Sequence, residues 1–345
     1  MAILITGNHG FIGCWLNIFI KEIDDNKIYG IDNRSSYGER LIDLKEGSNN
    51  IVEKQFFNNV SDTDKLIEIL NENNINQIFH ISGQAIVPRA FIDPGLTFDS
   101  NVMSTFSVLE ASRRAHYVEK ICIITSDKVY KNENKNKRFS ENDVLAGKDI
   151  YSTSKVICEH LAECYKKIHF DQSKIVEVVR LGNVVGGGDY SVNRLLPDLI
   201  RSYLNKNTFE VRYPQATRPF QHVVDVVNGI YSILMNNIKH DEENYLGDCW
   251  NLGPKNNTVM VVEDVIKLFT KVFHIDDIKP RKNSLPEDIL LAVDNTKYTE
   301  IFGNPNFDSS EAIIKAIEWY KKVHQEKKSP WDLTLKEVKS FLKFR

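Results

Sequence analysis

The chain has 345 residues, a formal net charge of −3 and 42% hydrophobic residues. This length allows about two domains of roughly 150 residues each, and the near balance of charge argues against a surface built for nucleic acid or membranes. The five cysteines form no CxxC pair, and no apolar run reaches the roughly 20 residues of a membrane span. We therefore expect no metal site, no disulfide framework, and no membrane or nucleic-acid partner.

Strand-like and helix-like segments alternate along the first half of the chain. Apolar runs predict strands at 2–5, 27–31, 51–57, 77–82, 120–125 and 174–181. Amphipathic stretches predict helices near 11–23, 62–73, 98–115 and 150–169. Because helices connect parallel strands, this alternation predicts an α/β fold with a Rossmann-type, doubly wound parallel sheet. A strand that begins at residue 2 leaves no room for a signal peptide, which predicts a cytoplasmic protein.

The alternation ends after residue 185. Helices are predicted near 193–205, 222–236, 260–273 and 309–323, and a strand at 248–252 could return to the main sheet. We therefore expect a NAD-binding Rossmann domain at 1–180, to which segments near 222–252 return. A smaller, interleaved α/β domain at 181–345 would bind the substrate.

Three glycines follow the first predicted strand at a three-residue spacing, namely Gly7, Gly10 and Gly13. In a dinucleotide-binding turn, the first makes the tight turn, the second admits the pyrophosphate and the third lets the helix pack on the strand. A glycine triplet alone is also compatible with an ordinary strand-to-helix turn. The second predicted strand, however, ends in Asp32, about twenty residues further on, where a ribose hydroxyl needs an acceptor. The combination predicts dinucleotide binding.

Asp32 also indicates which dinucleotide binds. Its carboxylate would accept hydrogen bonds from an unphosphorylated ribose and repel a 2′-phosphate, which favours NAD over NADP. Arg34 keeps NADP as the less favoured alternative, since guanidinium groups bind phosphates well. The same arginine could also be a solvated loop residue.

Tyr151 and Lys155 are four residues apart at the start of a predicted helix. This spacing places both side chains on one helix face, where the ammonium group would stabilise a phenolate and lower the pKa of the tyrosine. One such pair is expected by chance in a lysine-rich chain with thirteen tyrosines. Its position between the fifth and sixth predicted strands is what favours a catalytic role.

Ser126, Asp127 and Lys128 follow the fifth predicted strand directly. The carboxyl end of a parallel sheet is where doubly wound folds bind ligands. A hydroxyl, a carboxyl and an amine there could provide a hydrogen-bond donor, a general acid and a general base. For an isolated tripeptide, a loop cap and a surface charge would be the simpler interpretation.

Together these motifs resemble the extended short-chain dehydrogenase/reductase superfamily. Longer segments narrow the resemblance to the sugar-nucleotide 4,6-dehydratases, above all those that act on CDP-glucose. These segments are 80–89, 125–130, 180–189, 194–198, 217–223, 250–254 and 316–320. The resemblance covers nearly the whole chain, and its most specific part is the Asp-Lys pair, because many related dehydratases carry Glu where Lys128 stands.

The resemblance implies a nucleotide-sugar 4,6-dehydratase that uses and regenerates bound NAD. Tyr151 would take the proton of the sugar 4-hydroxyl, with Ser126 sharing that hydrogen bond. Lys155 would hold the phenolate and the nicotinamide ribose. Lys128 would then remove the C5 proton, and Asp127 would protonate the departing 6-hydroxyl. The product would be a 4-keto-6-deoxy sugar.

The resemblance also implies two sets of binding residues and a homodimer. The cofactor set is Gly7, Gly10, Phe11, Ile12, Gly13, Asp32, Asn33, Arg34, Asn59, Val60, Ile81, Ser82, Gly83, Gln84, Asn101, Tyr151 and Lys155. The set for the nucleotide-diphosphate sugar is Gln84, Asn183, Arg194, Leu195 and Arg218. The predicted helices near 98–115 and 150–169 resemble the dimer interface of the superfamily.

Alternatives remain open at the level of the sequence. Residues 30–36 are nearer to relatives that act on GDP- or UDP-sugars, which leaves the nucleotide base undetermined. A 4-epimerase needs only reversible oxidation at C4 and would leave Asp127 and Lys128 without a function. A non-catalytic NAD sensor could keep the fold without needing Tyr151 and Lys155.

Overall fold

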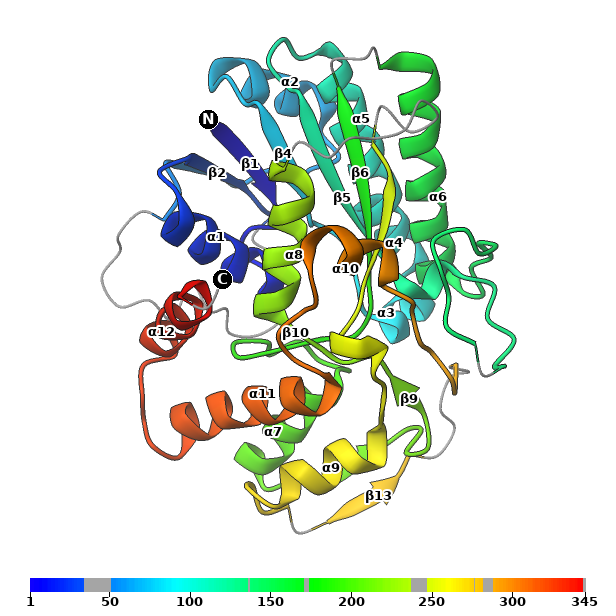
Figure 1. Cartoon of the computed structure of the whole chain (residues 1–345), viewed down its shortest axis with the longest axis vertical. Helices are drawn as coiled ribbons and strands as arrows, with labels where there is room; N and C mark the ends of the chain where they lie inside the picture. Colours follow the sequence, from blue (N-terminus) through cyan, green and yellow to red (C-terminus); the bar gives the residue numbers. More distant parts are fainter. Residues whose placement is uncertain are drawn as a thin grey trace.

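A computed structural model describes residues 1–33, 51–135, 137–170, 174–236, 247–275, 277–281 and 288–343. Within these residues, the main sheet has seven parallel strands in the order β11-β6-β5-β4-β1-β2-β3 (Figure 1). The strands are β1 (Ala2–Thr6), β2 (Lys27–Ile31), β3 (Lys54–Phe56), β4 (Gln77–His80), β5 (Lys120–Ser126), β6 (Ile175–Leu181) and β11 (Cys249–Leu252). The sheet confirms the predicted Rossmann-type α/β fold.

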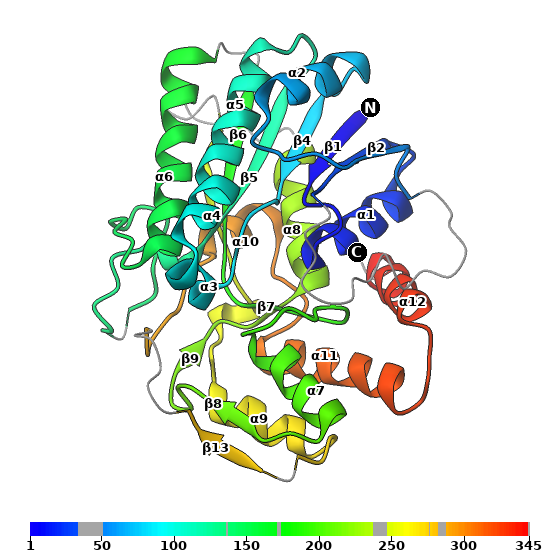
Figure 2. The ribbon, with the colours of Figure 1, turned by 180° about the vertical axis from the view of Figure 1, so that it is seen from behind.

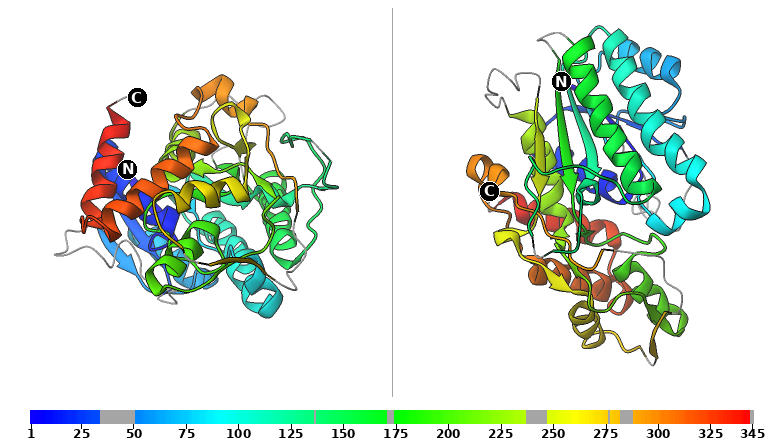
Figure 3. Two further views of the ribbon diagram at one scale, coloured as in Figure 1. Left: turned by 90° about the horizontal axis from the view of Figure 1, so that it is seen from below. Right: turned by 90° about the vertical axis from the view of Figure 1, so that its right-hand side faces the viewer.

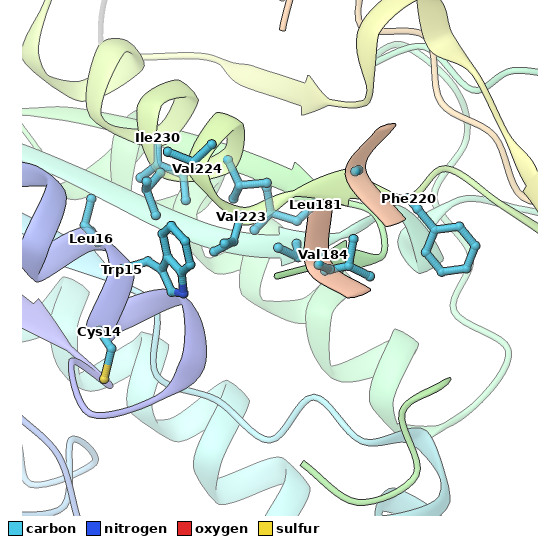
Figure 4. Packing of buried hydrophobic residues seen from close by; sticks show 14 of the residues in the cluster. Cys14, Trp15, Leu16, Leu181, Val184, Phe220, Val223, Val224 and Ile230 are labelled. Atoms are coloured by element: carbon cyan, nitrogen blue, oxygen red, sulfur yellow. The ribbon is translucent and has the colours of Figure 1, made fainter. Parts of the chain in front are cut away.

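Helices cover both faces of this sheet, so that the central strands are buried on both sides and read as continuous apolar runs. One face carries α1 (Phe11–Ile23) and α8 (Val223–Met235), and the other carries α2 (Thr63–Glu72), α5 (Ser104–Arg114) and α6 (Ile150–Cys164) (Figure 3). Each face has its own apolar core. On the first face, the Trp15 indole of α1 packs beside Val223 and Val224 of α8 (Figure 4).

The helices expected near 98–115 and 150–169 are not uniform α-helices. The first is divided into α4 (Pro94–Phe98), the π-helical turn η1 (Asp99–Met103) and α5, and α6 continues into a second π-helical turn, η3 (Tyr165–His169). The Asn101 carbonyl of the first π-helical turn accepts hydrogen bonds from the Ser104 amide and also from two side chains, Thr105 Oγ1 at 2.7 Å and Cys158 Sγ at 3.3 Å. The hydrophobic pattern does not predict such turns, because it fixes which face is buried and not the pitch.

A smaller set of elements lies beyond the carboxyl ends of the strands (Figures 1 and 2). Its paired short strands are β7 (Val184–Val185) with β10 (Gln221–His222), β8 (Phe209–Val211) with β13 (Ile278–Pro280), and β9 (Thr217–Arg218) with β12 (Met260–Val261). Its helices are α7 (Leu195–Asn205), α9 (Val262–Thr270) and α11 (Ser309–His324). The remaining helices are α3 (Val87–Ile92), α10 (Thr296–Phe302), α12 (Pro330–Leu342) and the 3-10 turns η2 (Asp127–Val129) and η4 (Lys255–Asn257).

The strand expected at 248–252 is β11, which pairs in parallel with β6 at the edge of the main sheet. The sequence did not predict α3, α10, α12 or the short strands of the smaller set. The strands are too short for a periodic pattern. The three helices carry terminal signals, namely Pro88 in the first turn of α3, Gly303 after α10, and Ser329 with Pro330 at the start of α12. No helix in the described ranges is long and apolar enough to cross a membrane.

Candidate active site

One cleft collects most of the side chains that the sequence predicted to act together. It lies at the carboxyl ends of β5 and β6 and is closed from the other side by α7, β8 and the segment that follows β8. Its lining includes Ser126, Asp127, Lys128, Tyr151, Lys155, Ile12, Ile81, Gly83, Asn183, Arg194, Leu195 and Arg218. A ligand edge at the carboxyl ends of parallel strands is the arrangement expected of a doubly wound sheet.

The start of α6 positions Tyr151. Asp149 accepts a hydrogen bond from the Ser152 amide at 3.0 Å, and the Ser152 hydroxyl accepts one from the Asp149 amide at 3.0 Å. This reciprocal capping box satisfies two amides at the start of the helix. It therefore fixes Tyr151 in the first turn of α6, and Lys155 follows one turn later on the same face.

The turn after β5 presents Ser126, Asp127 and Lys128. Ser126 Oγ accepts a hydrogen bond from the Lys128 amide at 3.2 Å and lies 3.2 Å from Asp127 Oδ1, to which it donates. The Ser126 hydroxyl also acts on the Tyr151 phenol, whose pKa it lowers. One hydroxyl thus connects the turn that carries the carboxyl and the amine with the helix that carries the phenol.

Asp127 is buried in an unusual way for a carboxyl group. Only 2% of the residue is exposed, and its Oδ2 has no hydrogen-bond partner among the described residues. Burial raises the pKa of Asp127 to about 6, and the positive charges of Lys128 and Arg218 act in the opposite direction. A carboxyl group with such a pKa can hold and deliver a proton near neutral pH.

Lys155 lies behind Tyr151 and is also buried. Its Nζ donates a hydrogen bond to the Ile124 carbonyl at 3.1 Å, and burial lowers its pKa. Burial raises the pKa of Tyr151 to about 12, against the effect of the Ser126 hydrogen bond. The tyrosine therefore needs additional positive charge nearby to act as a base, which a bound oxidised nicotinamide would supply.

The glycine turn between β1 and α1 has the geometry that the sequence predicts. Gly7 has φ of +71°, and a Cβ there would lie 2.8 Å from the Ser82 backbone. A Cβ on Gly13 would lie 2.3 Å from the Gly7 carbonyl oxygen, so a side chain would push α1 off β1. A Cβ on Gly10 would meet only that same oxygen, at 3.2 Å, and Gly10 is exposed. The turn therefore has no room for side chains at Gly7 and Gly13, where it packs against the protein, and is open to solvent at Gly10.

The end of β2 lies beside this turn. Asp32 Oδ2 accepts a hydrogen bond from the His9 amide at 3.2 Å, which holds the carboxylate next to the open glycine turn. Among the other residues of the predicted cofactor set, Asn33 donates to Asn59 at 3.3 Å and Val60 is buried in the core. Arg34 lies outside the described residues. The open turn and its adjacent carboxylate fit the pyrophosphate and ribose of a dinucleotide.

The segment after β4 borders the same space. The Gln84 amide donates to Asn101 Oδ1 at 2.8 Å, and the Gln84 side chain donates to Thr97 at 3.0 Å. A Cβ on Gly83 would lie 2.8 Å from Asn101 Oδ1 and 3.2 Å from Lys155 Nζ. Ser82 is held by Thr6, whose hydroxyl donates to it at 3.0 Å. These contacts fix the segment at the end of β4. Gln84 is not among the residues that line the cleft.

Comparison with known proteins places the chain in a family. Residues 3–253 match the model of the NAD dependent epimerase/dehydratase family. The chain belongs to this family. Membership in an NAD-dependent family confirms the cofactor that Asp32 and the glycine turn predicted. A curated relative is the CDP-glucose 4,6-dehydratase of Salmonella typhimurium, which is 28% identical over 333 residues, 92% of this chain and 90% of the relative.

Solved structures of family members share the fold. The UDP-glucuronic acid 4-epimerase of Bacillus cereus superposes with a TM-score of 0.80 at 22% identity and covers 94% of this chain and 100% of its own. The dTDP-glucose 4,6-dehydratase of Bacillus anthracis superposes with a TM-score of 0.77 at 21% identity and covers 96% of this chain and 99% of its own. The shared fold includes both reaction types and does not separate them.

The side of the cleft formed by the smaller set of elements is rich in arginine. Arg194 caps α7 and lies 3.7 Å from Asp189, and Arg218 on β9 is buried with its Nη1 donating to the Thr217 carbonyl at 2.7 Å. Two further arginines, Arg212 and Arg281, line the same cleft and were missed. Arg212 follows the alternating Phe-Glu-Val of β8, and that short strand pattern was the available signal.

Proposed function

We propose that this protein is a nucleotide-sugar 4,6-dehydratase that converts an NDP-hexose, such as CDP-glucose, to the NDP-4-keto-6-deoxyhexose. The observation that carries the proposal is that Asp127 and Lys128 line the same cleft as Tyr151 and Lys155. Oxidation at C4 requires only the tyrosine and the lysine. An acid and a base beside them are what elimination of water additionally requires.

NAD would supply reversible hydride transfer, so that the sugar undergoes no net oxidation. Gly7, Gly10, Gly13 and Asp32 would hold NAD at the end of the sheet. Tyr151 would take the proton of the 4-hydroxyl as the C4 hydride leaves, with Ser126 in the same hydrogen bond. Lys155 would favour the phenolate by its charge.

Lys128 and Asp127 would then carry out the elimination. The 4-keto group acidifies the C5 proton, which the Lys128 side chain would accept. Asp127 would donate its proton to the 6-hydroxyl, which leaves as water, and Lys128 would return a proton to C5 when C6 is reduced. The raised pKa of Asp127 supports this role, because the carboxyl must be protonated before it can act as an acid.

The two predicted domains would divide the ligands between them. Residues 1–180, with segments near 222–252, would bind NAD, and residues 181–345 would bind the nucleotide-diphosphate sugar. Arg194 and Arg218, with Asn183 and Leu195, would contact the substrate, because guanidinium groups bind a diphosphate through charged, paired hydrogen bonds. Gln84 is proposed for both ligands from the resemblance alone.

A homodimer is part of the same proposal. Phe98, at the end of α4, is 44% exposed and Met103, at the end of η1, is 41% exposed. Ile168 in η3, at the end of the neighbouring helix, is 72% exposed. Exposed apolar side chains on adjacent helices are typical of an interface with another chain.

Mass spectrometry on the purified protein tests the function directly. The protein is incubated with CDP-, GDP-, UDP- and dTDP-hexoses, with and without added NAD⁺. We expect one nucleotide series to give a product lighter by one water, which identifies both the reaction and the base. A sugar epimerised at unchanged mass would instead establish a 4-epimerase, the reaction of several structural relatives.

The variant Asp127→Asn tests the role of Asp127 as the acid. It keeps the size of the side chain but replaces one acceptor oxygen by an NH₂ donor and has no acidic proton to give to the leaving hydroxyl. We expect loss of water to slow by about 10²–10⁴-fold, whereas reduction of bound NAD⁺ by the substrate, followed at 340 nm, persists. Equal loss of both signals would show that Asp127 does not act specifically in the elimination.

A further inference from the structure

A buried ion pair lies next to the turn that carries Ser126, Asp127 and Lys128, outside the lining of the cleft. Arg180 of β6 donates from Nη2 to Glu159 Oε2 at 2.6 Å and from Nε to both carboxylate oxygens of Glu159, at 3.0 and 3.1 Å. The side chains are 4% and 7% exposed. Burying two charges offsets most of their attraction, so a buried pair contributes little net stability by itself. Its contacts suggest a positional role instead.

The pair holds both flanks of the turn. Before the turn, the Thr125 hydroxyl donates to Glu159 Oε1 at 2.7 Å. After it, Arg180 Nη1 donates to the Tyr130 hydroxyl at 2.8 Å, and the guanidinium lies 4.9 Å from the centre of the Tyr130 ring. The Tyr130 hydroxyl in turn donates to Asn251 of β11 at 2.6 Å. Only Ser126 to Val129 lie between the two anchored residues.

The same carboxylate adds to the contacts between α6 and the end of β5. Tyr151, Lys155 and Glu159 are four residues apart and share one helix face. Lys155 donates to the Ile124 carbonyl and Glu159 accepts from the Thr125 hydroxyl. Ser126, the next residue of the strand, lowers the pKa of Tyr151. Thr125 stands opposite Arg180 in the register of β5 and β6, so the guanidinium completes the connection across the sheet.

We propose that Arg180 and Glu159 are positioning residues that fix the 126–129 turn, through Thr125 and Tyr130, against Tyr151 and Lys155. Neither residue lines the cleft, so neither contacts the substrate. The roles of the turn residues rest on the function proposed above. The placement of the turn by the pair does not rest on that function. A 4-epimerase would use Ser126 beside Tyr151 for hydride exchange at C4 just as a dehydratase would.

The test replaces Thr125, because removing either charge would leave its partner buried and unpaired. Thr125→Val keeps the ion pair and the side-chain shape but removes the bond to Glu159, and Thr125→Ser keeps the hydroxyl. With NAD⁺ and the nucleotide hexose that gives turnover, we expect Thr125→Val to lower kcat at least ~10-fold through misplacement of the turn. KM should be unchanged, and Thr125→Ser should behave like the wild-type protein.

Hydrogen exchange of the protein with NAD⁺ bound provides a second measurement that needs no substrate. Amides of 126–130 should exchange faster in Thr125→Val than in Thr125→Ser. Thr334→Val is the matched control, since Thr334 is fully buried on α12 and its hydroxyl bonds to Pro330 and Trp319 instead. It should change neither kcat nor the exchange at 126–130.

The outcomes separate this inference from the proposed function. A Thr125→Val protein with wild-type kcat and wild-type exchange at 126–130 would overturn the positioning role. So would equal slowing of the valine and serine variants, because packing would then matter rather than the hydroxyl. Failure of the wild-type protein to release water would overturn only the 4,6-dehydratase assignment, since hydrogen exchange needs no substrate and kcat can equally be measured on an epimerisation.

Discussion

Asp127 is harder to ionise in the folded protein than in the unfolded chain. Its pKa is about 6 in the fold against an ordinary value of 3.8, so the folded state binds more protons between these values. Stability therefore falls as the pH rises from about 4 to about 6. We expect Asp127→Asn, which cannot ionise, to be more stable than the wild-type protein at pH 7 by about 3 kcal/mol.

Urea unfolding at pH 4 and pH 7 measures this difference. At pH 4 the wild-type carboxyl is mostly protonated in the folded state, so the two proteins should differ little. A stabilisation that is the same at both pH values would show that ionisation of Asp127 is not its source. The wild-type protein would thus be less stable at pH 7 because it buries an ionisable carboxyl group in the cleft. Such a loss of stability for the sake of activity is common at active sites.

The turn from β1 to α1 separates the requirements of folding from those of cofactor binding. A Cβ on Gly13 would strike the backbone of Gly7 and Asn8, whereas a Cβ on Gly10 would meet one oxygen at 3.2 Å. We expect Gly13→Ala to lower the free energy of unfolding by roughly 1–3 kcal/mol. Gly10→Ala should leave stability nearly unchanged and weaken NAD⁺ binding, because its methyl group occupies the open side of the turn.

Thermal unfolding and calorimetric titration with NAD⁺ distinguish these effects. Gly95→Ala is the matched control, since a Cβ there would meet only Asp93 Oδ1, at 3.9 Å. Full NAD⁺ affinity in Gly10→Ala would place the cofactor elsewhere. Unchanged stability in Gly13→Ala would mean that α1 can shift from β1 without cost.

At the scale of the whole molecule, the outer face of α4, η1 and α6 is the proposed dimer interface. We expect sedimentation equilibrium to give twice the 39.7 kDa mass of one chain. Phe98→Asp should shift the protein toward the monomer, because it would bury a charge in the interface. Ile314→Asp, on a similarly exposed residue of α11, should leave the dimer intact. A monomeric wild-type protein would contradict the proposal.

The sequence alone determined the main architecture and the dinucleotide turn. Both are local: strands buried on two faces appear as apolar runs, and the turn needs glycines at fixed spacing because backbone contacts of 2.3 to 2.8 Å leave no room for a Cβ. The pairing of Tyr151 with Lys155 was predictable for the same reason, since residues four apart lie on the same face of a helix. The short strands were not predictable, because their pairing partners are distant in the chain. The π-helical turns were not predictable, because a hydrophobic pattern fixes the buried face of a helix and not its pitch.

Only the tertiary structure decided what surrounds those motifs. The burial and the pKa of Asp127 depend on Gly182 and Arg218, which come from other segments of the chain. Arg180 of β6 and Glu159 of α6 form a buried ion pair that the sequence did not predict. The physical reason is that a residue's type fixes what chemistry it can perform. Its solvation and its partners, which fix whether it performs that chemistry, are set by packing between distant segments.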